Sequence, residues 1–332
     1  MGKVKPRHKN NRKHQTHPTG LPSVKDAEME EAELGSSKDD TLVLNIIEEV
    51  QSLNIEERLN GLRSLADLAE SSESVETIVK YKILKIIAPL LVDKSSEVRN
   101  ITAGILRNLS ATGSADICER LVKDDIMTPL LTLLQQYNDW KPESKTENSD
   151  TLLQAVNIIW NLCESDETAL KYFNSANVLN ILLRCLDYKT VGLDLSIAVC
   201  QCLNSVCEEN TSVLSVLRSY ESDLLTLLSI CATDNKMILL KTLAAGIVVN
   251  LNPSAPWLAS VLAVTAESLE KDLRTSVNQL SSQLPLDSAA LSSEVATLVE
   301  QTEALTLAQT MALETLANLS SDQGKTVTWT GK

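Results

Sequence analysis

The sequence predicts an all-α protein that folds as a right-handed solenoid of stacked helical repeats. A motif of the form Leu-x-Asn-Leu-Ser recurs along the chain, with its central residue at Asn108, Asn161, Asn250 and Asn318. Two degenerate copies carry Asp67 and Ser205 at the same place. Apolar residues make up 43% of the chain but aromatic residues only 3%, so Leu, Ile, Val and Ala must fill the layers between helices. A unit that recurs in this way is the signature of a solenoid.

The spacing of the motif defines the repeat. From Asp67 to Asn318, successive copies are 41, 53, 44, 45 and 68 residues apart. A second landmark, a Leu-Leu pair that opens an apolar helix, begins at residues 90, 130, 182 and 224, which are 40, 52 and 42 apart. Both measures give a unit of about 42 residues and place an insertion of about ten residues between Asn108 and Asn161. Helical units of this length are typical of armadillo and HEAT repeats.

The first 25 residues form a basic tail. They contain seven Lys or Arg residues, all three histidines and no acidic residue, and they are too polar to bury a core, so we expect disorder. Clustered Lys and Arg are typical of nuclear-import signals, and a merely solvated tail is the alternative. The candidate targeting residues are Lys3, Lys5, Arg7, Lys9, Arg12, Lys13, His14 and Pro18.

The repeat solenoid is expected over residues 41–320. An acidic spacer, residues 26–40, precedes it, and Asp39 or Asp40 is the expected N-cap of the first helix, near Thr41. Residues 138–150 are rich in Pro, Ser, Asn and Glu, which accounts for the insertion and predicts a loop before a helix at Thr151–Cys163.

The periodicity weakens after the fifth repeat. The Pro-containing run that begins at Asn252 breaks the helix, and over residues 252–300 we expect one or two longer helices, around Leu258–Val277 and Leu291–Val299. Leu305–Leu319 is predicted to be a further repeat helix. Residues 321–332 show no apolar periodicity, so we expect an irregular C-terminal end.

The composition argues against catalysis. Because the histidines all lie in the tail, the body cannot form Ser–His or Cys–His pairs or His-ligated zinc sites. It has no Gly-rich phosphate loop, and its seven cysteines lie among apolar helical residues, where buried free thiols are expected. The sequence therefore predicts a non-enzymatic protein with no cofactor and no metal.

The charge of the body predicts its class of partner. Beyond the tail, 44 acidic residues face 23 basic ones, a net charge of −21. Such a surface repels nucleic acid and attracts basic proteins. Lys241 interrupts the longest apolar run, so we expect no membrane-spanning segment.

The motif-bearing helices supply the candidate cargo groove, since residues i, i+4 and i+7 of a helix share one face. Its predicted residues are Asn100, Asn108, Gln154, Asn157, Asn161, Glu164, Gln201, Ser205, Glu208, Asn250, Glu314 and Asn318. Amide side chains in a row can pair with the backbone of an extended peptide, and Glu164 and Glu208 would attract its Lys and Arg side chains. The alternative is that each Asn caps or braces its own repeat.

Several segments resemble a known family. They are the basic start Met1-Gly2-Lys3 and the stretches Ala103–Ala111, Lys123–Leu130, Leu239–Gly246 and Leu305–Glu314. These segments are similar to those of the HEAT repeat-containing protein three / symportin family of armadillo/HEAT-repeat proteins. The sequence disfavours importin-alpha, since the Trp that stands there four residues before the Asn is replaced here by Gly104, Asn157, Gln201, Gly246 and Glu314.

The resemblance implies a chaperone and nuclear-import adaptor in ribosome biogenesis. Its cargo would be the basic large-subunit ribosomal proteins that accompany 5S ribosomal RNA, and a transportin-type import receptor would bind the tail. We expect a monomer that shuttles between cytoplasm and nucleus. The alternative is a general armadillo scaffold in signalling or the cytoskeleton.

The sequence differs from the family pattern in three respects. Pro18 is followed by Thr19 and not by the Tyr of the usual receptor signal. The stretch near Trp257–Gln301 is shorter and less acidic than the family's loop between its halves. The HEAT-like second half is absent, so we expect a partial form.

Overall fold

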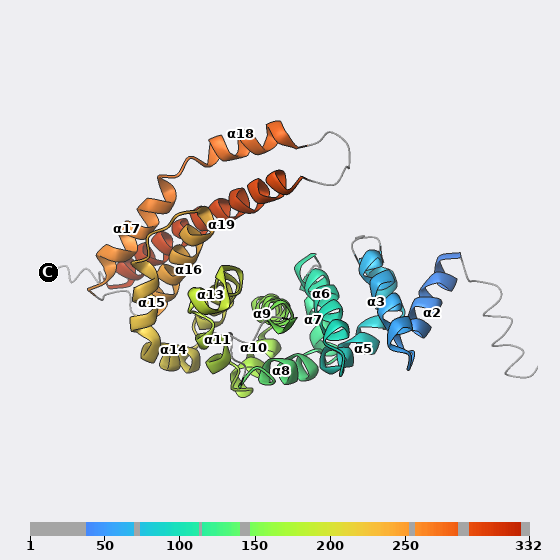
Figure 1. Cartoon of the computed structure of the whole chain (residues 1–332). Helices are drawn as coiled ribbons and strands as arrows, with labels where there is room; N and C mark the ends of the chain where they lie inside the picture. The colour runs from blue at the N-terminus through green and yellow to red at the C-terminus, as the bar shows by residue number, and fades with distance from the viewer. Residues whose placement is uncertain are drawn as a thin grey trace, which may run out of the picture.

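The computed structural model describes residues 38–69, 74–112, 115–139, 147–251, 256–284 and 292–326, and this part of the chain contains helices and no strand. The helices stack along one direction into an elongated array, as Figure 1 shows. The predicted all-α solenoid of armadillo-type repeats is therefore confirmed. The basic tail and most of the acidic spacer lie outside the described residues.

Two sets of helices build the array. The inner row consists of the motif-bearing helices, each packed on the next: α3 (Ile55–Ala69), α6 (Ser96–Thr112), α9 (Glu147–Ser165), α13 (Leu193–Cys207), α16 (Asn235–Leu251) and α19 (Ser293–Thr326). The remaining α-helices are α2 (Lys38–Val50), α4 (Ser74–Lys80), α5 (Ile83–Ile87), α7 (Ala115–Lys123), α8 (Met127–Gln135), α10 (Glu167–Ser175), α11 (Leu179–Arg184), α12 (Tyr188–Val191), α14 (Thr211–Leu217), α15 (Glu221–Leu228), α17 (Leu258–Leu269) and α18 (Leu273–Gln283), with short 3-10 segments at Ala88–Val92 and Arg218–Tyr220.

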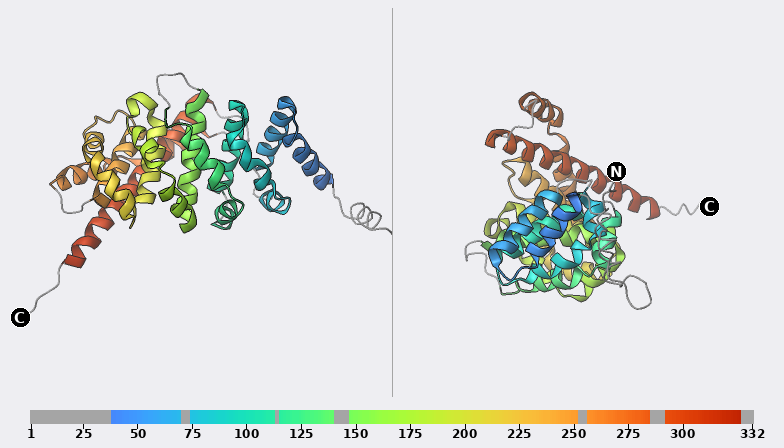
Figure 2. Two further views of the ribbon diagram at one scale, coloured as in Figure 1. Left: turned by 90° about the horizontal axis from the view of Figure 1, so that it is seen from below. Right: turned by 90° about the vertical axis from the view of Figure 1, so that its right-hand side faces the viewer.

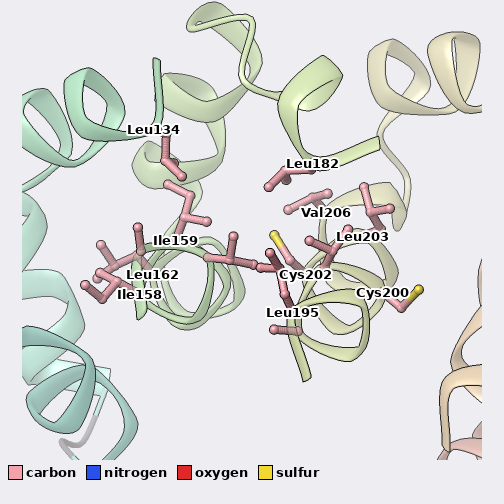
Figure 3. Close-up of a cluster of buried hydrophobic side chains, with 14 of the residues drawn as sticks. Leu134, Ile158, Ile159, Leu162, Leu182, Leu195, Cys200, Cys202, Leu203 and Val206 are labelled. Carbon is pink, nitrogen blue, oxygen red and sulfur yellow. The ribbon is translucent and has the colours of Figure 1, made fainter. Parts of the chain in front are cut away.

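The core is a series of aliphatic layers between neighbouring inner helices. Figure 3 shows part of this core, with Ile159 of α9 and Cys202 and Leu203 of α13 on neighbouring helices and Leu162 on the side of α9 away from α13. Leu182 of α11 lies in the same part of the core, and all five side chains are fully buried. Burying an aliphatic side chain of this size contributes roughly 1.5–3 kcal/mol. Since each layer needs both of its helices, the repeats stabilise one another.

A left-handed residue marks the same turn in three successive repeats. Lys82, Asp125 and Asn177 have φ of 53°, 61° and 54°, and each lies just before α5, α8 or α11. The Leu-Leu landmark lies inside α8 and α11, and in the first copy it lies in the 3-10 segment that follows α5. In the second copy the Ile126 N–H donates to the Leu121 carbonyl at 3.1 Å, which ends α7 in a left-handed C-cap. The three positions are 43 and 52 residues apart, so this turn repeats with the period of the motif.

The helix boundaries correct several expectations at the start of the solenoid and at the loop. Helix α2 begins at Lys38, so Asp39 and Asp40 lie inside the helix and neither is its N-cap. Helix α9 begins at Glu147, four residues before the expected Thr151, and takes in the last part of the predicted loop 138–150. Acidic residues are favourable in a first helical turn, which explains why these helices start early.

The region after the fifth repeat differs most from expectation. The helix predicted over Leu258–Val277 is two helices, because Asp272 caps α18 by accepting a hydrogen bond from the Thr275 N–H at 3.1 Å. Conversely, the two helices predicted at Leu291–Val299 and Leu305–Leu319 are one helix of 34 residues, α19, which runs on to Thr326. The expected irregular end is thus helical over residues 321–326. Residues 327–332 lie outside the described part.

Helix α19 is continuous for a physical reason. No Pro or Gly interrupts it between Ser293 and Asn318, and its buried side chains (Val295, Thr302, Leu305, Ala308, Ala312, Thr315 and Leu319) follow a helical period throughout. Its later part packs on α16 and α17, and α18 packs beside it in a projection from the array that Figures 1 and 2 both show. This long helix places Glu314 in the groove described below.

The contact between α2 and α3 requires a residue without a side chain at position 61. A Cβ on Gly61 would lie 2.7 Å from the backbone nitrogen of Val50 and 2.7 Å from the Cβ of Glu49. We expect Gly61→Ala to lower the free energy of unfolding by about 1–3 kcal/mol, as overpacking does, despite its better helix propensity. Gly104→Ala is the control, because nothing lies within 4 Å of its Cβ position. It should instead raise thermal stability slightly, and equal effects of the two variants in thermal denaturation would contradict the packing argument.

Candidate peptide-binding groove

Four inner helices enclose a groove of about 410 Å³. Helices α13 and α16 lie between α9 and α19 in the stack, and the groove is lined by residues of all four. The lining residues are Trp160, Glu164, Gln201, Asn204, Ser205, Glu208, Leu239, Leu243, Gly246, Asn250, Leu307, Thr310, Met311, Glu314, Thr315 and Asn318. Of the twelve predicted groove residues, this set contains Glu164, Gln201, Ser205, Glu208, Asn250, Glu314 and Asn318.

The inner helices run parallel, which follows from the hydrogen bonds between them. At their beginnings, Thr151 of α9 donates to Asn100 of α6 at 3.2 Å, and the ammonium of Lys236 of α16 lies 2.8 Å from a carboxylate oxygen of Asp194 of α13. At their ends, Asn250 of α16 donates to the Cys207 sulfur of α13 at 3.2 Å. Equivalent ends of neighbouring helices therefore lie side by side across the groove.

Three carboxylates converge at the edge formed by the later parts of these helices. Glu164 is the last residue but one of α9, Glu208 directly follows α13, and Glu314 lies on α19. The pKa of Glu164 is raised, first because the carboxyl group is partly buried and then because Glu314 and Glu208 are close. The C-terminal ends of α9 and α13 add the negative ends of their helix dipoles. The empty groove therefore carries unfavourable negative charge, which a bound cationic group would relieve.

The opposite edge of the groove is mainly apolar on α16 and α19, with Gln201 of α13 and Thr310 of α19 as its polar residues. Leu239 and Leu243 lie before Asn250 on α16, and Leu307 and Met311 lie before Glu314 on α19. Leu239 and Leu243 are buried, whereas Leu307 keeps 44% of its surface exposed. At 1.5 Å per residue, the seven residues from Leu307 to Glu314 on α19 separate the two edges by about 10 Å. The groove thus has an acidic edge and an apolar edge within the width of one extended chain.

Several of the predicted amides hold neighbouring repeats together. The Asn161 amide donates to the Ser110 hydroxyl of α6 at 2.9 Å, Asn250 donates to Cys207, and Asn100 accepts from Thr151. These three amides therefore have the structural role that was the alternative to peptide binding. Each of them joins two adjacent repeats, however, and does not brace its own repeat. Such hydrogen bonds fix the spacing of the inner row.

Five predicted residues do not line the groove: Asn100, Asn108, Gln154, Asn157 and Asn161. All belong to α6 or to α9 before Glu164, on the side of the stack away from α19. Asn108 accepts a hydrogen bond from the Arg107 guanidinium at 2.8 Å. The Gln154 side-chain oxygen is buried with no hydrogen-bond partner. The groove therefore spans fewer inner helices than the predicted row of residues, which also included α6.

Asn204 and Trp160 were missed by the sequence argument. The Asn204 amide donates to the carbonyls of Cys200 and Leu243 at 3.0 and 2.9 Å, which joins α13 to α16. Gly246 lies against this amide, since a Cβ there would meet the Asn204 side-chain oxygen at 2.7 Å. The Trp160 indole N–H donates to the Ser205 hydroxyl at 2.8 Å and orients it at the groove surface. Each of the two directly precedes a motif residue, Asn161 or Ser205. This proximity is the signal by which the sequence could have identified them as groove residues.

The targeting residues predicted between Lys3 and Pro18 lie outside the described residues. Among the residues that are described, no cluster of His, Cys, Asp and Glu side chains has the arrangement of a metal site. In the same part of the chain, none of the helices combines the length and the apolar character that crossing a bilayer requires. Cys163 and Cys200 have their thiol pKa raised to about 12, in each case mainly by burial.

Solved structures of armadillo repeat proteins share the fold. An engineered protein has a TM-score of 0.55 at 16% identity, with 84% of this chain and 98% of that chain covered. A designed armadillo repeat protein solved in complex with the peptide (KR)4 has a TM-score of 0.51 at 17% identity, covering 80% and 98%. A chain from a study of a phosphorylation switch between cadherin and beta-catenin has a TM-score of 0.53 at 18% identity, covering 84% and 52%.

Sequence comparison finds relatives that share one name, although no protein-family model matches the chain. The mouse (Mus musculus) HEAT repeat-containing protein 3 is 34% identical over 238 residues, which cover 67% of this chain and 34% of the mouse protein. The human (Homo sapiens) protein of the same name is 31% identical over 268 residues, or 74% of this chain and 39% of the human protein. With its armadillo-type stack of helices, the chain is a repeat scaffold that belongs to the family of HEAT repeat-containing protein 3 and spans between a third and two-fifths of the length of these relatives.

Proposed function

We propose that this chain is a non-enzymatic chaperone and nuclear-import adaptor whose groove binds extended basic segments of the large-subunit ribosomal proteins that accompany 5S ribosomal RNA. The observation that carries the proposal is the convergence of Glu164, Glu208 and Glu314 from three helices on one groove. Lys and Arg side chains would replace the repulsion among these carboxylates with attraction, and partial burial strengthens such pairs.

Two further observations support a basic partner. Residues 26–332 carry 44 acidic and 23 basic residues, so the field of the whole body attracts a positively charged protein and speeds its encounter. The designed armadillo repeat protein that shares this fold was solved with the basic peptide (KR)4, so an armadillo stack can hold such a segment. Ribosomal proteins are rich in segments of this kind because they bind RNA phosphates.

The basic tail supplies the second half of the proposal. Its Lys and Arg residues, from Lys3 to Lys13, have the composition that import receptors bind, and a transportin-type receptor would carry the loaded complex from cytoplasm to nucleus. Cargo and receptor would thus contact opposite charges on one chain. A basic cargo shielded by the acidic groove would also be kept from nonspecific contacts with nucleic acid.

The test is binding of purified full-length protein to the two ribosomal proteins, measured by calorimetry at about 0.1 M and 0.5 M salt, which changes electrostatic screening strongly. We expect sub-micromolar affinity that weakens with salt. Glu208→Lys should abolish it, whereas Glu303→Lys, an exposed position on α19 outside the groove, should not. Asn161→Ala is unsuitable as a probe because this amide lies outside the groove and braces α9 to α6.

The outcomes separate the candidate functions. Binding that Glu208→Lys and Glu303→Lys weaken equally would contradict use of the groove and leave only a general charge effect. No binding of either ribosomal protein would contradict the cargo proposal and favour a general armadillo scaffold, in signalling or the cytoskeleton.

A further inference from the structure

The two edges of the groove impose a sequence pattern on any extended segment that crosses the inner helices. Successive side chains of an extended strand point to opposite sides. One set of alternate side chains would therefore face Glu164, Glu208 and Glu314, and the other set would face the accessible apolar residues Leu307 and Met311. An extended segment in which basic and apolar residues alternate therefore fits both edges of the groove.

The chain itself contains such a segment. Residues 3–7 read Lys-Val-Lys-Pro-Arg, so three basic residues alternate with two apolar ones. In an extended conformation Lys3, Lys5 and Arg7 point to one side, which matches the three carboxylates in number, and Val4 and Pro6 point to the other. Pro6 suits this conformation because it fixes an extended backbone and needs no hydrogen bond from its nitrogen.

We propose that residues 3–7 of the same molecule occupy the groove when cargo is absent and compete with it. This inference rests on the proposed function, because it gives the groove a regulated occupant. It concerns the tail as a ligand of the chain's own acidic edge, a role separate from its proposed recognition by an import receptor.

The connection is long enough for this contact. Thirty residues separate Arg7 from Lys38, the first described residue of α2, and they span up to about 100 Å when extended. From α3 to α16 the stack advances by four inner helices, or roughly 40 Å at the usual interhelical spacing. Tethering through a linker of this length gives an effective concentration on the order of 1 mM. Even a segment that binds with a dissociation constant near 100 μM would then lower the apparent affinity of a competitor about tenfold.

The proposal couples cargo binding in the groove to receptor binding by the tail. A groove-bound tail is withheld from a receptor, and cargo that displaces the tail makes it available. Since coupling between two ligands is reciprocal, receptor bound to the tail would raise the affinity of the groove for cargo by the same factor. The empty protein would therefore be a poorer import substrate than the loaded protein.

The experiment uses full-length protein and a fluorescent (Lys-Leu)4 peptide, with affinity read from fluorescence anisotropy. We expect Lys3→Ser/Lys5→Ser/Arg7→Ser to bind the peptide about tenfold more tightly than wild type, by the estimate above. The matched control Lys9→Ser/Arg12→Ser/Lys13→Ser removes the same charge from the same tail outside the alternating segment, and it should leave the affinity unchanged. Val4→Ser/Pro6→Ser keeps every charge and should still tighten binding, by about threefold, because half of the alternation is lost.

A second measurement tests the contact directly. A labelled peptide of residues 1–9 should bind the Lys3→Ser/Lys5→Ser/Arg7→Ser protein, and this binding should disappear when Glu164, Glu208 and Glu314 are also changed to Gln. Sedimentation of the wild type should show no dimer, because the occupant belongs to the same molecule.

Each contrary result has a distinct meaning. If (Lys-Leu)4 binds wild type and Lys3→Ser/Lys5→Ser/Arg7→Ser equally well, the tail is not an occupant, although the groove still binds basic segments. If the peptide binds none of the proteins, the proposed function of the groove fails and this inference fails with it. A dimer that dissociates when residues 3, 5 and 7 are changed would assign the occupant to a second copy and overturn the intramolecular contact.

Discussion

Replacing Glu164, Glu208 and Glu314 together by Gln is expected to weaken binding of a (Lys-Leu)4 peptide about 100-fold. Each partly exposed carboxylate paired with Lys contributes on the order of 1 kcal/mol, and a 1.4 kcal/mol loss is tenfold in affinity. Gln keeps the size and polarity of each side chain, so the loss reports charge. Glu167→Gln/Glu270→Gln/Glu303→Gln makes the same change in net charge at exposed positions outside the groove, and it should weaken binding less than threefold.

The same variant should be slightly more stable than wild type in the absence of peptide. The pKa of Glu164 is raised above its ordinary value by burial and by Glu314 and Glu208. For an acid with a raised pKa in the folded state, the native protein binds the proton more tightly than the unfolded chain, so stability falls as the pH rises through that pKa. The variant avoids this loss at neutral pH, by roughly 0.5 kcal/mol after allowance for solvent screening. Thermal denaturation with and without peptide measures both effects.

Peptide affinity should follow pH in the opposite direction. A bound Lys or Arg favours the ionised form of Glu164 and lowers its pKa, so binding releases a proton and strengthens as the pH rises through the raised pKa of the free protein. Anisotropy titrations from about pH 4 to pH 7, a range that begins below the ordinary Glu pKa of about 4.3 and extends well above it, would show this. Affinity that is flat across the range in wild type, or identical slopes in wild type and the triple Gln variant, would contradict the role of these carboxylates.

Breaking the buried ion pair between α16 and α17 is expected to cause the second large effect, this time on stability. The ammonium of Lys241 lies 2.6 Å from a carboxylate oxygen of Glu267, and only 9% of the Lys241 side chain is exposed, against 36% for Glu267. Glu267→Ala would leave a buried ammonium without its partner. We expect it to lower the free energy of unfolding by about 2–3 kcal/mol, below the value for a fully buried pair because Glu267 is partly exposed.

The matched variant is Lys241→Met, which removes the charge that must be compensated and retains the apolar stem. It should change the free energy of unfolding by less than about 1 kcal/mol, since the Glu267 carboxylate that remains is 36% exposed and keeps its contact with water. The double variant Lys241→Met/Glu267→Ala should recover most of the stability lost in Glu267→Ala, which a double-mutant cycle in denaturant would quantify. Equal losses in Glu267→Ala and Lys241→Met would show that packing, and not the unpaired charge, determines the effect.

Much of the architecture is local and could be predicted. The spacing from Asp67 to Asn250 reflects one helical unit with its own caps and apolar stripe, so the repeat length and the position of the insertion are visible in the sequence. The left-handed turns at Lys82, Asp125 and Asn177 follow the same period. The boundary errors arose where one helix continued through a polar stretch, as α19 does at residues 300–304, since a polar segment without Gly or Pro remains helical when its buried stripe is continuous.

The sequence by itself determined the repeated helical unit, the acidic character of the body and the face on which Glu164 and Glu208 lie, because composition and helical period depend only on residues close in the chain. Only the tertiary structure decided that the predicted groove residue Glu314 comes close to Glu164 across 150 residues, that Asn161 and Asn250 brace neighbouring repeats, and that Leu307 and Met311 form the opposite edge. These relations depend on how the inner helices stack and how far α9 lies from α19. Stacking is set by the sum of many aliphatic contacts between repeats, which no single repeat specifies.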